Sequence, residues 1–215
     1  MKELMRFYVL VTGFPIYALL LRPRVYFEDE QRENNKIKGA ALIVSNHYSW
    51  KDYLFPFFHY FGRKIYAVML EGVFKISRFL NYFVSVIGGI RADRDIMGMR
   101  FIDEAVDKLK KGKLVEIFPE AHNTTDGLIH DFKPSYIMIA LRANVPIVPV
   151  AVDGNYRIGK GASAIIGKSI TLCDMCSSKD PTREEIEEMN DLVRGKVIEL
   201  KQLLDRKVEE ERRRK

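Results

Sequence analysis

Cysteine and histidine, two of the residues that build metal centres, are scarce in this sequence. Cys173 and Cys176 form a single Cys-x-x-Cys, whereas a four-thiolate zinc site needs a second pair. The four histidines include no two with metal-ligand spacing on one predicted element. We therefore expect two buried, reduced thiols and no metal.

Several functional signatures are also missing. There is no G-x-S-x-G nucleophile elbow, which excludes the usual serine hydrolase route, and no zinc finger or RNA-binding aromatic motif. Nucleic-acid binding would rest on charge alone, so we do not expect it. The net charge of +6 suits an anionic partner, which includes nucleic acid, an acidic lipid surface and a phosphorylated substrate, and does not choose among them. With 215 residues and no internal repeat, the chain is expected to form one domain with terminal extensions.

Long hydrophobic runs are absent except near the amino terminus. Residues 7–21 carry no charge, but a spanning helix needs roughly 17 to 25 apolar residues, so this run is short. Gly13 and Pro15 lie near its middle and predict a kinked or split helix, that is, a bent interfacial hairpin. Arg22 and Arg24 follow the run, where they can meet anionic head groups. The alternative is a buried core helix.

The chain from residue 41 onward alternates short apolar runs with helical patterns, which predicts an α/β domain. The runs are nearly continuously hydrophobic, as strands covered on both faces should be. The expected fold is a mostly parallel central sheet flanked by helices. Its predicted strands are 41–45, 65–70, 83–87, 114–118 and 147–152.

Three helices are predicted beyond the amino-terminal segment. Apolar residues recur at helical spacing over 97–111, and a shorter helix over 134–142 begins with a proline. The segment 182–215 has an acidic first turn, a basic end and one apolar stripe. The expected organisation is a membrane-interfacial helical segment (1–30), a catalytic domain (31–181) and a carboxyl-terminal amphipathic basic helix (182–215).

His47 and Asp52 form the first candidate for chemistry. They follow the predicted strand 41–45, so His47 lies at a strand's carboxyl end, where open α/β sheets bind ligands. An offset of five residues turns about 140° in a regular helix, so the two side chains can meet only across a strand-to-helix turn. There the carboxylate can fix the imidazole tautomer and leave the other ring nitrogen to take a proton from a hydroxyl.

Two further polar clusters follow predicted strands. Residues 88–94 set Arg91 and Arg94 beside a glycine pair, and guanidinium groups suit bidentate phosphate recognition; a solvated charged loop is the equal alternative. Residues 118–124 bring Glu120, Asn123 and Thr124 to the same edge, where they can position the hydroxyls and phosphate of a polyol. All three clusters are expected to converge on one crevice.

In this order the clusters resemble the glycerolipid acyltransferases typified by bacterial 1-acylglycerol-3-phosphate acyltransferase. The NHxxxxD block of that family matches residues 46–52, GxxFIxR aligns with 88–94, FPEGTRS matches only at 118–120, and the VPIVPV-like strand is 145–150. The DGxL and FK elements between the last two blocks are also present, at 126–128 and 132–133.

The resemblance implies that His47 and Asp52 are the catalytic dyad and that Arg94 binds substrate. Arg91 occupies the phenylalanine position of the second block, and Asn123 stands where the family has a phosphate-binding arginine. Arg91 can compensate for that missing charge, which is a hypothesis based on its nearness to Arg94. The expected substrate-binding residues are Asn46, Arg91, Arg94, Glu120, Asn123, Thr124 and Lys133.

The resemblance implies acyl transfer from acyl-CoA or acyl carrier protein, as co-substrate, to a lysophospholipid, most simply 1-acylglycerol-3-phosphate, in phospholipid biosynthesis. No cofactor is expected. The expected location is the cytoplasmic face of the cell membrane, on an anionic lipid surface. Two alternatives stay open at this point: a lipid hydrolase that uses the same His–Asp pair, and a membrane-binding module without catalysis.

Overall fold

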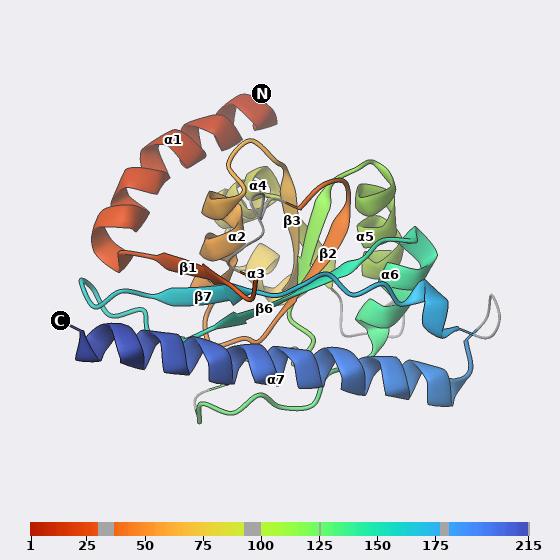
Figure 1. The fold of residues 1–215 in the computed structure, drawn as a ribbon. Coiled ribbons are helices and arrows are strands. Elements are labelled where there is room, and N and C mark those ends of the chain that lie inside the picture. Colours follow the sequence, from red (N-terminus) through yellow and green to blue (C-terminus); the bar gives the residue numbers. More distant parts are fainter. Residues whose placement is uncertain (30–36, 93–99, 125, 177–180, 215) are drawn as a thin grey trace.

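The computed structural model describes residues 1–29, 37–92, 100–124, 126–176 and 181–214 (Figure 1). The strands are β1 (Arg24–Phe27), β2 (Ala41–Ser45), β3 (Ile65–Leu70), β4 (Gly89–Ala92), β5 (Leu114–Ile117), β6 (Ile147–Val152) and β7 (Ser163–Ile166). The α-helices are α1 (Lys2–Leu21), α2 (Leu54–His59), α3 (Glu71–Lys75), α4 (Arg78–Ile87), α5 (Arg100–Lys110), α6 (Ser135–Ala143) and α7 (Arg183–Arg213). Two short 3₁₀ helices, η1 (Trp50–Tyr53) and η2 (Cys173–Met175), complete the described elements.

The seven strands form one sheet in the order β1-β7-β6-β2-β5-β3-β4. Every neighbouring pair is parallel except β6 and β7. The predicted mostly parallel α/β fold is therefore confirmed. The predicted strands 41–45, 65–70 and 147–152 have the observed bounds, and the fourth, 114–118, ends one residue earlier at Ile117.

The predicted strand 83–87 is wrong, because these residues form the last part of α4. The Ser77 side chain caps the helix by accepting a hydrogen bond from the Leu80 amide, and Gly88 ends it with a φ of 107°. A short apolar run does not distinguish a strand from a helix. The strand begins instead at Gly89 and includes Arg91, in a segment that the sequence reading treated as a loop.

Helices cover both faces of the sheet, and each face has its own hydrophobic core (Figure 1). The first core packs β2, β5 and β6 against α5, α6 and α7. The second packs the opposite face of the sheet against α1, η1 and α2. Side chains alternate between the faces of a strand, so Leu42 and Val44 enter the first core while Ala41 and Ile43 enter the second.

The predicted amino-terminal hairpin is also wrong, since residues 2–21 form one helix that includes Pro15. Leu10, Tyr17 and Leu21 lie on one stripe and are buried in the second core, which favours a continuous helix despite the proline. Gly13 allows a close approach to Phe58, whose ring lies 3.2 Å from where a β-carbon would be.

Arg6 connects this helix to the rest of the fold through hydrogen bonds. Its guanidinium is 4% exposed and donates hydrogen bonds from Nη1 to the carbonyls of Ile65 (3.2 Å) and Ile87 (2.9 Å). The Tyr53 hydroxyl donates to the Ile87 carbonyl as well, at 2.6 Å. The ends of β3 and α4 are thus joined through side chains to α1 and η1.

The carboxyl-terminal helix is confirmed as one long α7, with Thr182 as its cap and its apolar stripe in the first core. The predicted helix 134–142 is α6, and the described part of 97–111 forms α5 from Arg100 onward. One expectation for the thiols is wrong: Cys173 is exposed, and only Cys176 is half-buried. Both are free cysteines.

Candidate active site

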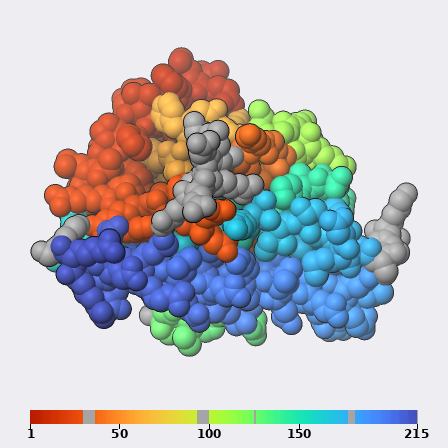
Figure 2. Space-filling view, in the orientation of Figure 1, coloured from red at the N-terminus to blue at the C-terminus, as the bar shows by residue number. Residues whose placement is uncertain are grey.

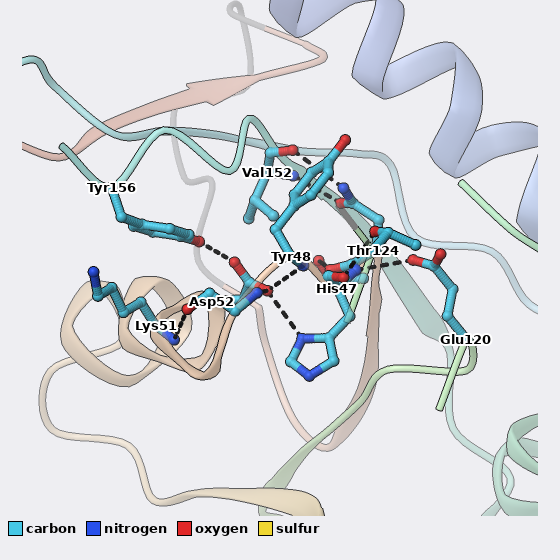
Figure 3. A network of polar contacts seen from close by, with 11 residues as sticks. His47, Tyr48, Lys51, Asp52, Glu120, Thr124, Val152 and Tyr156 are labelled. Carbon is cyan, nitrogen blue, oxygen red and sulfur yellow. Dashed lines mark hydrogen bonds and ion pairs between the residues drawn. The ribbon is translucent and has the colours of Figure 1, made fainter. Parts of the chain in front are cut away.

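Two of the three predicted polar clusters, those that follow β2 and β5, lie together at one edge of the sheet. β6, β2 and β5 are neighbours and run parallel, so their carboxyl ends meet there. Asn46 and His47 follow β2, Glu120 follows β5, and Val152 ends β6. The clusters after β2 and β5 therefore converge, as predicted for these two (Figure 3).

His47 and Asp52 are in hydrogen-bond contact, with Nδ1 of the ring 2.9 Å from Oδ2 of the carboxylate. They meet across the turn that leads from β2 into η1, as the five-residue offset requires. Because a carboxylate accepts hydrogen bonds, Nδ1 carries the ring proton and Nε2 keeps its lone pair. Figure 3 shows the free side of the ring pointing away from the polar network.

The local sequence explains how Asp52 reaches this position. Asp52 is the third residue of η1, and Ser49 caps that helix in a capping box. Oδ2 of Asp52 accepts from the amides of Tyr48 and Ser49, each at 2.7 Å, in addition to His47. The residue is 1% exposed, so this set of donors replaces water around the carboxylate.

The imidazole of His47 is held on its face as well as at its edge. It stacks on Phe118 with ring centroids 4.2 Å apart and an interplanar angle of 20°. The His47 side chain keeps 18% exposure, so a reactant can reach it from solvent. The ring is therefore oriented, singly protonated on the Asp52 side and accessible on the other.

Glu120 and Thr124 hold the main chain of His47. Oε1 of Glu120 accepts from the His47 amide and Oε2 from the His130 amide, both at 2.9 Å. The amide and the hydroxyl of Thr124 donate to the His47 carbonyl at 2.8 and 2.9 Å. Both side chains are buried and fix the loop around the dyad. That they also bind substrate stays a prediction.

Asn46 joins the ends of β2 and β6. Its side-chain amide donates to the Val152 carbonyl at 3.2 Å, and its side-chain oxygen accepts from the Val152 amide at 2.9 Å. The residue is 1% exposed. Its observed role is to extend the sheet register past β2, and substrate binding by Asn46 stays a prediction.

The predicted arginine cluster lies farther along the sheet. Arg91 is on the edge strand β4, exposed, with Nη2 donating to Oδ1 of Asn81 at 2.8 Å and the guanidinium 4.7 Å from the centroid of the Phe74 ring. β5 and β3 lie between this strand and β2. Arg94 falls outside the described residues.

Asn123 and Lys133 are both exposed, so their side chains are open to a ligand. Ala121 occupies the position where the acyltransferase block has glycine. Ala121 adopts the left-handed conformation with a φ of 56°, which explains why glycine suits this position. His130 lies near this loop, with Nε2 3.0 Å from Oδ2 of Asp126.

Sequence reasoning did not find Tyr156. This residue lies between β6 and β7, and its hydroxyl donates to Oδ1 of Asp52 from 104 positions away (Figure 3). No local spacing links the two residues. The only available signal is an aromatic hydroxyl in the polar loop that follows the predicted strand 147–152.

A second buried carboxyl group, Glu116, lies on β5 beneath the site. It is 1% exposed, and its Oε2 has no hydrogen-bond partner among the described residues. Burial, and then the negative charge of Asp52, raise the pKa of Glu116 well above its usual value. Within the described part of the chain, no group of three or more His, Cys, Asp or Glu residues is arranged to hold a metal ion.

Similarity to known proteins extends over most of the chain. Residues 24–153 match the family model described as Acyltransferase. A 1-acyl-sn-glycerol-3-phosphate acyltransferase of Bacillus subtilis is 24% identical over 180 residues, which cover 81% of this chain and 87% of the relative. A Caenorhabditis elegans protein provisionally given the same enzyme name is 28% identical over 77% of this chain, which spans 61% of that relative's length.

A solved structure is similar over almost the whole chain. The crystal structure of the 1-acyl-sn-glycerophosphate acyltransferase from Thermotoga maritima superposes with a TM-score of 0.62 and 27% sequence identity. The match covers 94% of this chain and 83% of the other.

Proposed function

Since the chain belongs to the acyltransferase family, we propose that it moves a fatty acyl group from an acyl thioester to the hydroxyl of a lysophospholipid, with 1-acylglycerol-3-phosphate as the acceptor. The observation that carries the proposal is the contact between Nδ1 of His47 and Oδ2 of Asp52, which leaves Nε2 on the open side of the ring at the carboxyl edge of the sheet. The names of the relatives in Bacillus subtilis and Thermotoga maritima support this acceptor.

In the proposed reaction, Nε2 of His47 removes the proton from the acceptor hydroxyl while its oxygen attacks the thioester carbonyl carbon. Asp52 stabilises the imidazolium that forms. The tetrahedral intermediate then expels the carrier's thiolate, which takes the proton from His47, so an oxygen ester and a free thiol leave the site. General-base catalysis of this kind contributes roughly 100 to 10,000-fold in rate.

Exposed cations and amides are proposed to bind the acceptor's phosphate. Arg91 is a candidate because its guanidinium is exposed and its orientation is fixed by Asn81 and Phe74. Asn123 and Lys133 are candidates because their side chains are open to solvent. An Arg91→Ala variant is expected to raise the apparent KM for the phosphorylated acceptor, and an unchanged KM would refute the compensating role of Arg91.

We also propose that α1 attaches the enzyme to the membrane by lying in the interface. α1 is long and apolar enough to cross a membrane by length and composition. However, one stripe of it is buried in the second core, while the opposite side lies at the molecular surface (Figure 2). The large exposed apolar residues of α1 are Leu4, Met5, Phe7, Tyr8, Val11, Phe14, Ile16, Leu19 and Leu20.

Charge near the end of α1 supports an anionic surface as the partner. Arg22 is exposed directly after the helix. Arg24 is less available, because its guanidinium is paired with Glu211 of α7 at 2.9 Å. The cytoplasmic face of the cell membrane is the proposed location, where acyl-CoA or acyl carrier protein can supply the acyl group.

The central experiment measures transfer of a radiolabelled acyl group from acyl-CoA and from acyl carrier protein to a panel of lysolipids in detergent micelles. Wild type is expected to form labelled diacyl product, and His47→Ala should abolish it. His59→Ala is the matched control, because His59 is an exposed histidine at the end of α2. Labelled free fatty acid would instead identify a hydrolase, and no turnover on the whole panel would favour a membrane-binding module.

Membrane attachment is tested by flotation with vesicles of phosphatidylglycerol or phosphatidylcholine. Leu19→Glu, at a residue that is 72% exposed on α1, is expected to reduce binding. Leu192→Glu is the control, because Leu192 is an exposed leucine on α7. Equal loss of binding in both variants would contradict the proposed role of α1.

A further inference from the structure

The carboxylate of Asp52 has two oxygen atoms with different partners. Oδ2 accepts from Nδ1 of His47 and from the amides of Tyr48 and Ser49. Oδ1 accepts from the hydroxyl of Tyr156. The loop between β6 and β7 therefore contributes a side chain to a group whose other partners all lie within 47–49.

The loop that carries Tyr156 is fitted closely to the dyad. Its start is tied to β2 by the paired hydrogen bonds between Asn46 and Val152. Gly154 has a φ of 68°, and a β-carbon there would lie 2.7 Å from the ring of Tyr48, so only glycine allows this approach. If the loop after β6 did not pack this closely, the Tyr156 hydroxyl would not reach Oδ1 of Asp52.

The ring of Tyr156 is also oriented by its neighbours. It lies against Phe55 of α2, with ring centroids 6.3 Å apart, and Nζ of Lys51 is 5.5 Å from its centroid. Burial and the charge of Asp52 raise the pKa of Tyr156, so its hydroxyl stays protonated and can only donate to the carboxylate.

We infer that Tyr156 is a positioning residue of this site, whose hydroxyl fixes the rotation of the Asp52 carboxylate and moderates its effect on His47. A donor on Oδ1 withdraws charge from the carboxylate, so Oδ2 stabilises the imidazolium less strongly than a free carboxylate would. The catalytic part of this inference rests on the proposed acyl transfer. The electrostatic part concerns His47 and can be measured without substrate.

Other charged groups near Asp52 must be considered before a titration is interpreted. Lys51 of η1 lies over the Tyr156 ring, Glu116 of β5 is close enough for Asp52 to raise its pKa, and Glu120 contacts the His47 amide. None of these groups is altered by replacing Tyr156 with phenylalanine. A change in the titration of His47 in that variant can therefore be attributed to the lost hydroxyl.

The first readout is the imidazole titration of His47, followed by NMR of ¹⁵N-labelled protein in micelles. The sequence has four histidines, and His47→Ala identifies the resonance. Tyr156→Phe is expected to change this measured curve, because Oδ1 of Asp52 then keeps the charge that the hydroxyl withdraws. Tyr60→Phe is the control, because it removes a hydroxyl from the second core that has no hydrogen-bond partner among the described residues.

The second readout is steady-state transfer. Tyr156→Phe is expected to lower kcat by about 10- to 100-fold, the range for losing a hydrogen bond to a charged group, with KM for the lysolipid unchanged. The acid limb of kcat/KM should move to higher pH. A purely structural role would lower the amplitude of the profile and leave its midpoint in place.

The outcomes separate the two proposals. An unchanged His47 titration in Tyr156→Phe overturns the inference, whether or not wild type transfers acyl groups. If Tyr156→Phe shifts the His47 titration but keeps the wild-type kcat, Tyr156 affects only the electrostatics of the pair, and its positioning role is overturned. Absence of transfer by wild type, with the titration still shifted in Tyr156→Phe, rejects the proposed function while the coupling between Tyr156 and the dyad stands.

Discussion

A buried carboxyl group at the carboxyl edge of the sheet has several hydrogen-bond donors, whereas one in the core beneath has an oxygen with no donor among the described residues. Asp52 at the edge and Glu116 in the core are each 1% exposed. Asp52 accepts four hydrogen bonds, two of them from main-chain amides, whereas Oε2 of Glu116 has no partner among the described residues. Burial alone therefore does not mark a functional carboxylate, and the set of donors around it distinguishes the two regions.

The sharpest test of this contrast is the same chemical change at both positions. Asp52→Asn is expected to lower kcat for acyl transfer by about 100- to 10,000-fold, because an amide can turn its NH₂ toward His47 and reverse the imidazole tautomer. Steady-state transfer assays measure the loss. Asp174→Asn, at an exposed aspartate of η2, is the control. If Asp52→Asn kept most of the wild-type kcat, the proposed role of the pair would be wrong.

Glu120 resembles Asp52 in being a buried carboxylate with its own hydrogen-bond donors, since both of its oxygen atoms accept hydrogen bonds from main-chain amides. Glu120→Gln replaces one acceptor with a donor and leaves a buried amide unpaired. The free energy of unfolding is expected to fall by about 1 to 3 kcal/mol, which thermal unfolding monitored by circular dichroism can detect. The matched change at an exposed position, Glu184→Gln, should have almost no effect. If Glu120→Gln and Glu184→Gln were equally stable, the hydrogen bonds that Glu120 accepts would not stabilise the fold.

Glu116→Gln should give the opposite result to Asp52→Asn in the transfer assay, with kcat unchanged. The effect is expected in the pH dependence of stability. Because the pKa of Glu116 is raised in the folded chain, its proton stabilises the fold fully below the usual pKa of 4.5. That contribution is lost as the pH rises through the folded pKa.

Wild type should therefore lose more thermal stability than Glu116→Gln between about pH 4.5 and neutrality. Midpoints of unfolding measured across this range provide the comparison. Parallel curves for the two proteins would show that Glu116 has donors that resemble those of Asp52.

The smallest expected effect is at Ala121, next to Glu120. Its left-handed conformation costs about 1 to 2 kcal/mol for a residue with a β-carbon, and glycine adds about 0.5 to 1 kcal/mol of unfolded-state entropy. Ala121→Gly should thus stabilise the chain slightly, by roughly 0.5 kcal/mol. Ala105→Gly inside α5 should destabilise it. A loss of stability in Ala121→Gly would contradict the strain at this turn.

The sequence alone was sufficient for elements whose signals are local. The strand 147–152 has the predicted bounds, and the contact between His47 and Asp52 follows from the turn after β2. Two features were missed. A short apolar run such as 83–87 fits either a strand or a helix, and the local caps at Ser77 and Gly88 identify it as the end of α4. Tyr156 reaches Asp52 only because β6 lies beside β2.

The buried guanidinium of Arg6 makes α1 a structural member of the catalytic domain. An anchor on a flexible tether would let the domain rotate freely above a bilayer. Here the helix is bound through Arg6 to the ends of β3 and α4, and its inner stripe belongs to the second core. If α1 is the membrane contact, folding itself sets the tilt of the sheet and the height of His47 above the lipid. Each molecule then meets its substrate in one orientation, and the orientational entropy of encounter is lost during folding instead of during catalysis.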